Sequence, residues 1–105
     1  MGILDWLLGS INKGVAEWQQ TPGALLLDVR TAAEYRSGHI PGSVHLPQQQ
    51  LGRIEQPAPD KNTPLFTYCA SGARAKNAAE SLRMRGYKQV KAIGGISSYR
   101  GEVEK

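Results

Sequence analysis

One apolar run near the start of the chain limits the folds that are open to it. Residues 24–29 are continuously apolar except for Asp28, and Thr21-Pro22-Gly23 stands directly in front of them. A half-exposed strand would alternate apolar and polar residues, whereas an unbroken run bounded by turn residues is typical of a strand buried on both faces. The run therefore predicts a central strand of a parallel sheet that is covered by helices.

Strand-like and helix-like segments alternate along the rest of the chain. Further strand-like runs lie at 43–46, 65–68 and 89–93, and helix-like stretches lie at 12–20, 31–36, 75–85 and 96–99, while 48–54 is helical or irregular. The second helix-like stretch begins with Thr31-Ala32-Ala33-Glu34, the pattern of a capping box. This alternation predicts an α/β fold with a parallel sheet of four to five strands, right-handed crossovers and helices on both faces.

The length of 105 residues predicts one domain that spans positions 1–105. Residues 1–10 are an apolar N-terminal extension that is too short to cross a bilayer and lacks the basic start of a secretion signal. We expect a short amphipathic turn there that packs on the domain, and a role at a partner or membrane surface stays open. Residues 102–105 are expected to be a frayed tail.

The only cysteine opens a loop that closes on an arginine, with the sequence Cys69-Ala70-Ser71-Gly72-Ala73-Arg74. A strand-like run precedes the loop and a helix-like stretch follows it, so the loop amides and the helix N-terminus are expected to point at the sulfur. Peptide dipoles in that position favour negative charge, and the thiolate is the nucleophilic form of cysteine. We therefore interpret Cys69 as a nucleophile, and the alternative is an inert buried thiol.

Much of the net charge of +4 lies around this loop and the helix-like stretch after it. Most of these basic residues are expected on a solvated face, and the functional alternative is a mild electrostatic field that attracts small anions toward Cys69. Aromatic residues are not interleaved with the basic ones, so no nucleic-acid partner is predicted. A single cysteine cannot form an internal disulfide, and no Cys/His cluster has zinc-ligand spacing. We therefore predict no metal and a reducing compartment, the cytoplasm.

Several stretches occur in a specific order over roughly residues 24–99. They are Leu26-Leu27-Asp28-Val29-Arg30, Glu34-Tyr35, Gly38-His39-Ile40-Pro41-Gly42-Ser43, the Cys69 loop, Gly86-Tyr87 and Gly94-Gly95-Ile96. In this order they resemble the single-domain rhodanese-like sulfurtransferases. The Gly-His-Ile-Pro-Gly stretch between the Asp-Val-Arg strand and the Cys loop is the most specific of them.

The resemblance implies a rhodanese-like fold and a two-step covalent transfer of sulfane sulfur. Cys69 would take the outer sulfur of a small anionic donor (thiosulfate, polysulfide or a persulfide), and a thiol or cyanide acceptor would remove it from the Cys69 persulfide. The amides of residues 70–74 would bind the negative charge, and no cofactor is needed. Related phosphatases and arsenate reductases have one residue more between Cys and Arg than the four here, so the loop favours sulfur transfer.

The alternative is a sulfur-carrier or interaction module of the same fold that works with a protein sulfur donor and has little small-molecule activity. The position after the cysteine is often basic in thiosulfate-using relatives, and here it is Ala70. Ala75 stands where the family often has serine, and Tyr99 stands where a tryptophan is common. Ala70 removes a charge that would help to bind a dianionic donor.

Two charged residues after the first strand are expected to support the site. We expect Asp28 to form a charge-assisted pair with Arg74, because both lie at the same sheet edge, and this pair would hold the shape of the loop. Arg30 is expected to pair with Glu34, four residues further on.

The remaining candidate residues are expected to stabilise turns. His39 is expected to pin its turn by a hydrogen bond, with proton transfer as the alternative, and the same holds for His45. Gly72 is expected to supply a backbone conformation or a close approach that a Cβ would block. Ser71 is expected either to donate its hydroxyl to the bound sulfur or to stabilise the turn.

Overall fold

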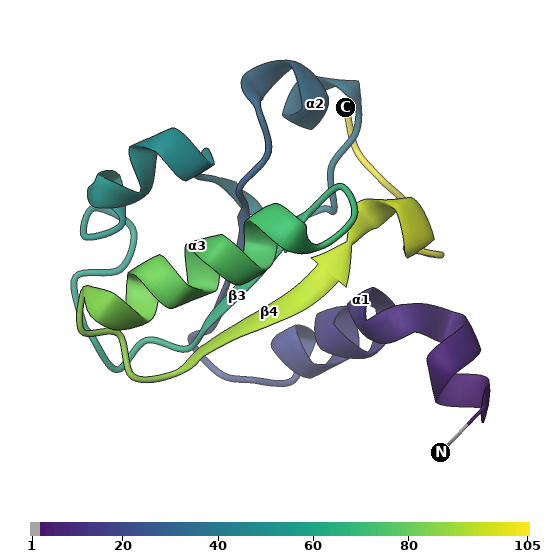
Figure 1. Ribbon diagram of the computed structural model, residues 1–105, viewed down its shortest axis with the longest axis horizontal. Coiled ribbons are helices and arrows are strands. Elements are labelled where there is room, and N and C mark those ends of the chain that lie inside the picture. Colours follow the sequence, from purple (N-terminus) through teal and green to yellow (C-terminus); the bar gives the residue numbers. More distant parts are fainter. Residues whose placement is uncertain (1–2) are drawn as a thin grey trace.

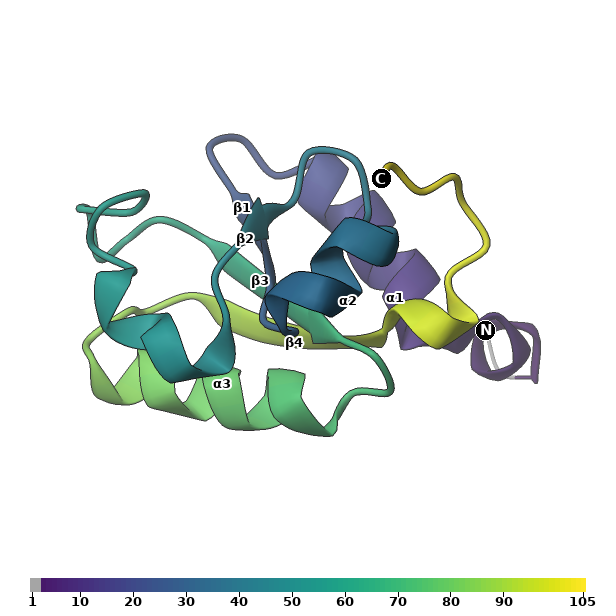
Figure 2. The same cartoon turned by 90° about the horizontal axis from the view of Figure 1, so that it is seen from above.

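The computed structural model describes the backbone of residues 3–105 and the side chains of residues 11–105. Within this part of the chain, four parallel strands form one sheet in the order β2-β1-β3-β4 (Figures 1 and 2). The strands are β1 (Leu25–Asp28), β2 (Val44–His45), β3 (Leu65–Cys69) and β4 (Val90–Gly95). The predicted α/β fold with a parallel sheet of four to five strands is confirmed.

The helices lie on both faces of the sheet, as predicted. Figures 1 and 2 show α3 and α1 on opposite sides of β3 and β4. The helices are α1 (Ile3–Gln19), α2 (Ala32–Ser37), α3 (Ala73–Met84) and two short 3₁₀ helices, η1 (Gln48–Arg53) and η2 (Ile96–Ser98).

Neighbouring residues of the central strand β1 serve two different halves of the core. Leu26 packs with Ile11 and Val15 of α1 on one face, whereas Leu27 packs with Leu82 of α3 on the other. Successive side chains of a strand point to opposite faces, so a strand covered on both sides needs apolar residues at every position. This explains the unbroken apolar run from which the fold was predicted.

Three expectations about the ends of elements and of the chain were wrong. Helix α1 is continuous from Ile3 to Gln19 instead of starting near Asn12 after a separate turn, and the side chains of residues 1–10 lie outside the described part. One glycine inside a helix costs only about 1 kcal/mol, so Gly9 need not interrupt α1. Strand β4 continues through Gly94-Gly95, where a tight turn was expected, because Gly95 pairs with Cys69 after a register shift.

The third correction concerns the C-terminal tail, which does not fray. The backbone of Glu104 exchanges two hydrogen bonds of 2.8 Å with the backbone of His39, in a short antiparallel bridge. The Glu104 carboxylate also lies 3.6 Å from Nε2 of His39. These contacts fix the tail beside the loop after α2.

Side chains protect the outer edge of strand β4. The Arg83 guanidinium donates a 3.0 Å hydrogen bond to the Val90 carbonyl, and Lys91 forms a 2.7 Å ion pair with Glu17 of α1. At the opposite edge of the sheet, β2 contains only two residues. Across the described residues, we find no helix whose length and apolar character would let it traverse a bilayer.

Candidate functional site

Cys69 lies at the carboxyl end of the buried strand β3, and α3 begins four residues later. Its Sγ accepts two backbone hydrogen bonds, from the N–H of Gly72 at 2.9 Å and from the N–H of Ala75 at 3.3 Å. Amides and a helix N-terminus directed at the sulfur favour a negative charge on it. The predicted order of strand, loop and helix is therefore confirmed. Cys69 is buried, with only 1% of its surface exposed.

Two glycines give the loop its shape. Gly72 has a φ of +122°, a conformation that other residues rarely adopt, so the expected backbone role of Gly72 is confirmed. A Cβ on Gly95 of β4 would overlap the carbonyl oxygen of Ala70. The same carbonyl accepts a 3.1 Å hydrogen bond from the N–H of Ser97. The end of β4 and the first turn of η2 thus support the loop, while Ser71 and Ala73 remain exposed.

The partner of Arg74 is Glu34 of α2, so the expected pairing of Arg74 with Asp28 was wrong. The two guanidinium nitrogens of Arg74 lie 2.8 and 3.0 Å from the two carboxylate oxygens of Glu34. Glu34 is also the acidic member of the predicted capping box, which is confirmed: its N–H donates to Thr31 Oγ1 at 3.2 Å, and Thr31 N–H donates to its carboxylate at 2.9 Å. Hydrogen bonds from Arg74 and from the Thr31 backbone lower the pKa of Glu34 to about 2.

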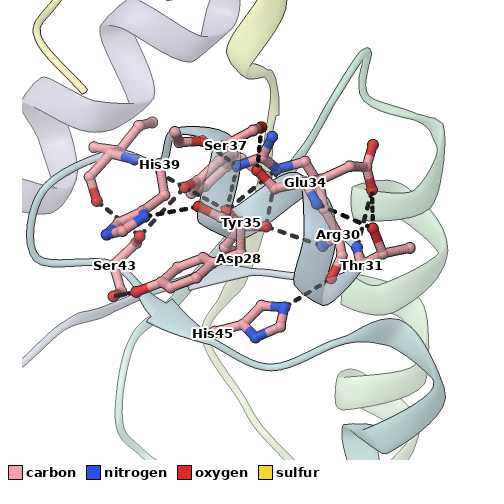
Figure 3. A network of polar contacts seen from close by, with 12 residues as sticks. Asp28, Arg30, Thr31, Glu34, Tyr35, Ser37, His39, Ser43 and His45 are labelled. Carbon is pink, nitrogen blue, oxygen red and sulfur yellow. Dashed lines mark hydrogen bonds and ion pairs between the residues drawn. The ribbon is translucent and has the colours of Figure 1, made fainter. Parts of the chain in front are cut away.

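Asp28 is fully buried and binds Arg30, so the expected pairing of Arg30 with Glu34 was also wrong (Figure 3). The Asp28 carboxylate accepts hydrogen bonds from the backbone N–H of Arg30 at 2.9 Å, from its guanidinium at 2.8 Å and from the hydroxyl of Tyr68 at 2.7 Å. The Arg30 guanidinium also donates to the Gly38 carbonyl at 2.7 Å. A buried carboxylate needs several such donors, and the residue two positions later supplies them most directly.

Tyr68 of β3 is a member of this network that the sequence analysis missed. Its hydroxyl accepts a 3.1 Å hydrogen bond from the N–H of Ile40 and lies 3.2 Å from the hydroxyl of Ser43. Burial raises the pKa of Tyr68, which keeps the hydroxyl protonated for Asp28. Tyr68 stands directly before Cys69 in an apolar run, and nothing in this sequence position indicates a contact with the Gly-His-Ile-Pro-Gly segment.

The two histidines support the backbone at the two ends of α2: His39 binds its last turn, and His45 binds the segment before it. His39 Nδ1–H donates to the Tyr35 carbonyl at 3.0 Å, as expected of a residue that pins its turn, and His45 Nε2–H donates to the Arg30 carbonyl at 2.9 Å. The ring of Tyr35 stacks on both imidazoles, at centroid distances of 3.8 and 4.5 Å. Among the described side chains, no group of three or more His, Cys, Asp or Glu residues is arranged to hold a metal.

Comparisons with known proteins agree with this geometry. The family model of the rhodanese-like domain matches residues 11–102. YrkF of Bacillus subtilis (strain 168), a candidate sulfur carrier protein by its name, is 37% identical over 82 residues, which are 75% of this chain. The thiosulfate sulfurtransferase PspE of Escherichia coli (strain K12) is 34% identical over 71 residues, which cover 67% of this chain and 68% of PspE.

Solved structures lead to the same family. A structure described as rhodanese with anions from E. coli has a TM-score of 0.73 and 30% sequence identity, over 78% of this chain and 98% of that chain. The match with YrkF covers only 43% of YrkF. Because the family model covers most of the sequence and the solved structure shares the fold, the chain belongs to the family of rhodanese-like domains.

Proposed function

We propose that the protein transfers sulfane sulfur through a persulfide on Cys69. The observation that carries this proposal is the pair of backbone N–H groups, from Gly72 and Ala75, that donate to the Cys69 sulfur. They stabilise a thiolate before transfer, and further loop amides between Ala70 and Arg74 would bind the charge of a persulfide. The resemblance to a thiosulfate sulfurtransferase and to a candidate sulfur carrier supports the same chemistry.

The reaction divides into two displacements at sulfur. In the first, the Cys69 thiolate attacks the outer sulfur of the donor, a new S–S bond forms, and the donor group leaves with the electron pair of the broken bond. In the second, a thiolate or cyanide attacks the outer sulfur of the Cys69 persulfide, and Cys69 leaves as a thiolate. Each step exchanges one bond to sulfur for another, so no external oxidant or reductant is consumed, and the kinetics are ping-pong.

The donor is a small anionic sulfur compound such as thiosulfate, polysulfide or a persulfide, and the acceptor is a thiol or cyanide. The mechanism needs Cys69 as a free thiol, so we propose a reducing compartment, the cytoplasm.

A second function is favoured by two observations at the loop. Cys69 is 1% exposed, and both terminal guanidinium nitrogens of Arg74, Nη1 and Nη2, are hydrogen-bonded to Glu34. With Ala70 next to the cysteine, the loop has no free cation for a dianionic donor. This arrangement suits a sulfur-carrier module that receives its sulfur from a protein and has low activity with thiosulfate.

The first prediction tests the nucleophile. The purified protein is incubated with thiosulfate, polysulfide or glutathione persulfide, and its intact mass is measured. We expect the addition of one sulfur atom, and we expect none in Cys69→Ser, whose hydroxyl is a far weaker nucleophile. Circular dichroism of the variant checks that the fold is kept. Sulfur transfer at the wild-type rate by Cys69→Ser would disprove the covalent mechanism.

A further inference from the structure

An open groove of about 800 Å³ runs between α3 and β4 and ends at the Cys69 loop. Ser71, Gly72 and Gly94 form its end at the loop. Gly72 is the residue whose N–H donates to the Cys69 sulfur, so the groove ends at the peptide unit that holds the sulfur. Cys69 itself does not line the groove.

The rim of the groove is basic. Lys76 and Arg83 of α3 and Lys91 of β4 line it, against one acidic residue, Glu80. Lys76 is exposed and forms no ion pair within the part of the chain whose side chains are described. The ion pairs of the other two cations are largely exposed, at 3.5 Å for Arg83 to Glu80 and at 2.7 Å for Lys91 to Glu17. Exposed pairs contribute little free energy and exchange readily for another anion.

The floor of the groove is made of small side chains. Ala79 is buried and Ala92 is partly buried, so the floor between the basic rims is apolar. None of the described residues that line the groove is aromatic, so it offers no surface on which bases would stack. An extended polypeptide with acidic side chains fits both the small apolar residues of the floor and the charge of the rims.

We propose that this groove docks an acidic, extended segment of a protein that exchanges sulfur with Cys69. This inference rests on the proposed function and names the class of partner. The loop lacks a free cation, because Arg74 is bound by Glu34 and Ala70 is uncharged, so the groove supplies the recognition of negative charge. In the exchange, a partner cysteine thiolate attacks the outer sulfur of the Cys69 persulfide. The partner becomes the persulfide and Cys69 leaves as a thiolate.

The test compares three synthetic peptides that differ only in charge. Each has a flexible linker and a terminal cysteine, preceded by four Glu, four Gln or four Lys residues. The full chain is first loaded with sulfur from glutathione persulfide, and transfer to each peptide thiol is then followed by mass. We expect kcat/KM to be on the order of ten-fold higher for the Glu peptide than for the Gln peptide, lowest for the Lys peptide, and more nearly equal at high salt.

Charge-reversal variants locate the effect. Arg83→Glu and Lys76→Glu are each expected to lower the ratio of Glu-peptide to Gln-peptide kcat/KM several-fold. Lys76→Glu places an acid in the first turn of α3, where helix dipoles favour it, so this variant keeps the fold. The matched control is Arg36→Glu, which makes the same charge change at an exposed position of α2 that does not line the groove. Its peptide ratio should equal that of the wild type.

Binding is measured separately from chemistry, by fluorescence anisotropy with labelled peptides in which serine replaces cysteine. The docking groove would be supported if the wild type binds the Glu peptide more tightly than the Gln peptide, and if Arg83→Glu abolishes this difference while Arg36→Glu does not. Equal binding of all three peptides would overturn it, as would stronger competition by a short single-stranded RNA than by the Glu peptide. Failure of the wild type to accept sulfur from any donor would instead overturn the proposed function. The two failures can be told apart, because the binding measurement does not depend on sulfur transfer.

Discussion

At the scale of single residues, the Cys69 sulfur is held by backbone groups, and the arginines Arg74 and Arg30 are bound to other partners. Arg74 binds Glu34, and Arg30 binds Asp28 and the Gly38 carbonyl. Backbone amides stabilise one negative charge on sulfur but do not add the positive charge that a dianion would need. The position directly after the cysteine is therefore where one added charge should change the choice of donor.

The second prediction follows for Ala70, whose side chain is partly exposed. Ala70→Arg should lower KM for thiosulfate several-fold, because an exposed charge beside a dianion contributes on the order of 1 kcal/mol. The effect should lie mainly in KM, since the charge binds ground state and transition state alike, and salt should weaken it. Steady-state kinetics with glutathione persulfide serve as the control. Equal gains with both donors would show that Ala70 does not set donor preference.

At the scale of elements, Glu34 joins two helices that are far apart in the sequence. It completes the N-terminal capping box of α2 and binds Arg74 in the first turn of α3. The position of α2 is thereby tied to the segment that carries the Cys69 loop.

The third prediction concerns the pH dependence of this link. The pKa of Glu34 is lowered in the folded protein from 4.5 to about 2, so its contribution to stability is present above pH 4.5 and is lost as the pH falls below 4.5 and through 2. One third of the Glu34 side chain is exposed, and solvent screening limits the contribution to about 1 kcal/mol. Urea unfolding should therefore show wild type more stable than Glu34→Gln at pH 6, with the difference shrinking steadily as the pH falls to 2.

The matched control is Glu80→Gln, which removes an exposed carboxylate 3.5 Å from Arg83. It should change stability little at any pH. A difference between wild type and Glu34→Gln that stays constant from pH 6 to pH 2 would contradict the role assigned to the Glu34 carboxylate.

The elements could be predicted better than their side-chain partners. The unbroken run of β1, the capping box of α2 and the order of strand, loop and helix around Cys69 each depend on local sequence, and the structure contains all three. The partners of Arg74 and Arg30 depend on how α2 packs beside the sheet, which periodicity does not report. Asp28 ends β1 and Glu34 lies in α2, which follows β1, so both acids are near the carboxyl end of the same strand. Only burial of Asp28 beside Tyr68 decides which cation each acid binds.

At the scale of the whole molecule, the sheet separates two halves of the core that have no large side chain in common. Leu26 belongs to the half under α1, and Leu82 belongs to the half under α3. Both side chains are fully buried. The strands that carry the two halves are the same, so we expect the halves to unfold together.

The fourth prediction tests this cooperativity. Leu26→Ala and Leu82→Ala should each lower the free energy of unfolding by about 2–5 kcal/mol, through lost burial and the cavity that is left. Each variant should still show one transition with the wild-type denaturant slope when followed by both circular dichroism and tryptophan fluorescence. Met84→Ala is the control, because Met84 is 81% exposed and its loss should change stability by less than about 0.5 kcal/mol. Separate transitions by the two probes would show that the halves are independent.

The protected outer edge of β4 has a consequence for behaviour at high concentration. An open sheet edge is a template on which strands of other molecules can assemble into fibrils. At β4, Arg83 donates a hydrogen bond to the Val90 carbonyl, and the ion pair of Lys91 and Glu17 lies across the same edge. At the other edge, β2 has only two residues and is too short to pair with a long strand. Two of the cations that line the proposed docking groove, Arg83 and Lys91, therefore also hinder self-assembly. Replacing both with small polar residues would expose an edge on which aggregates can grow.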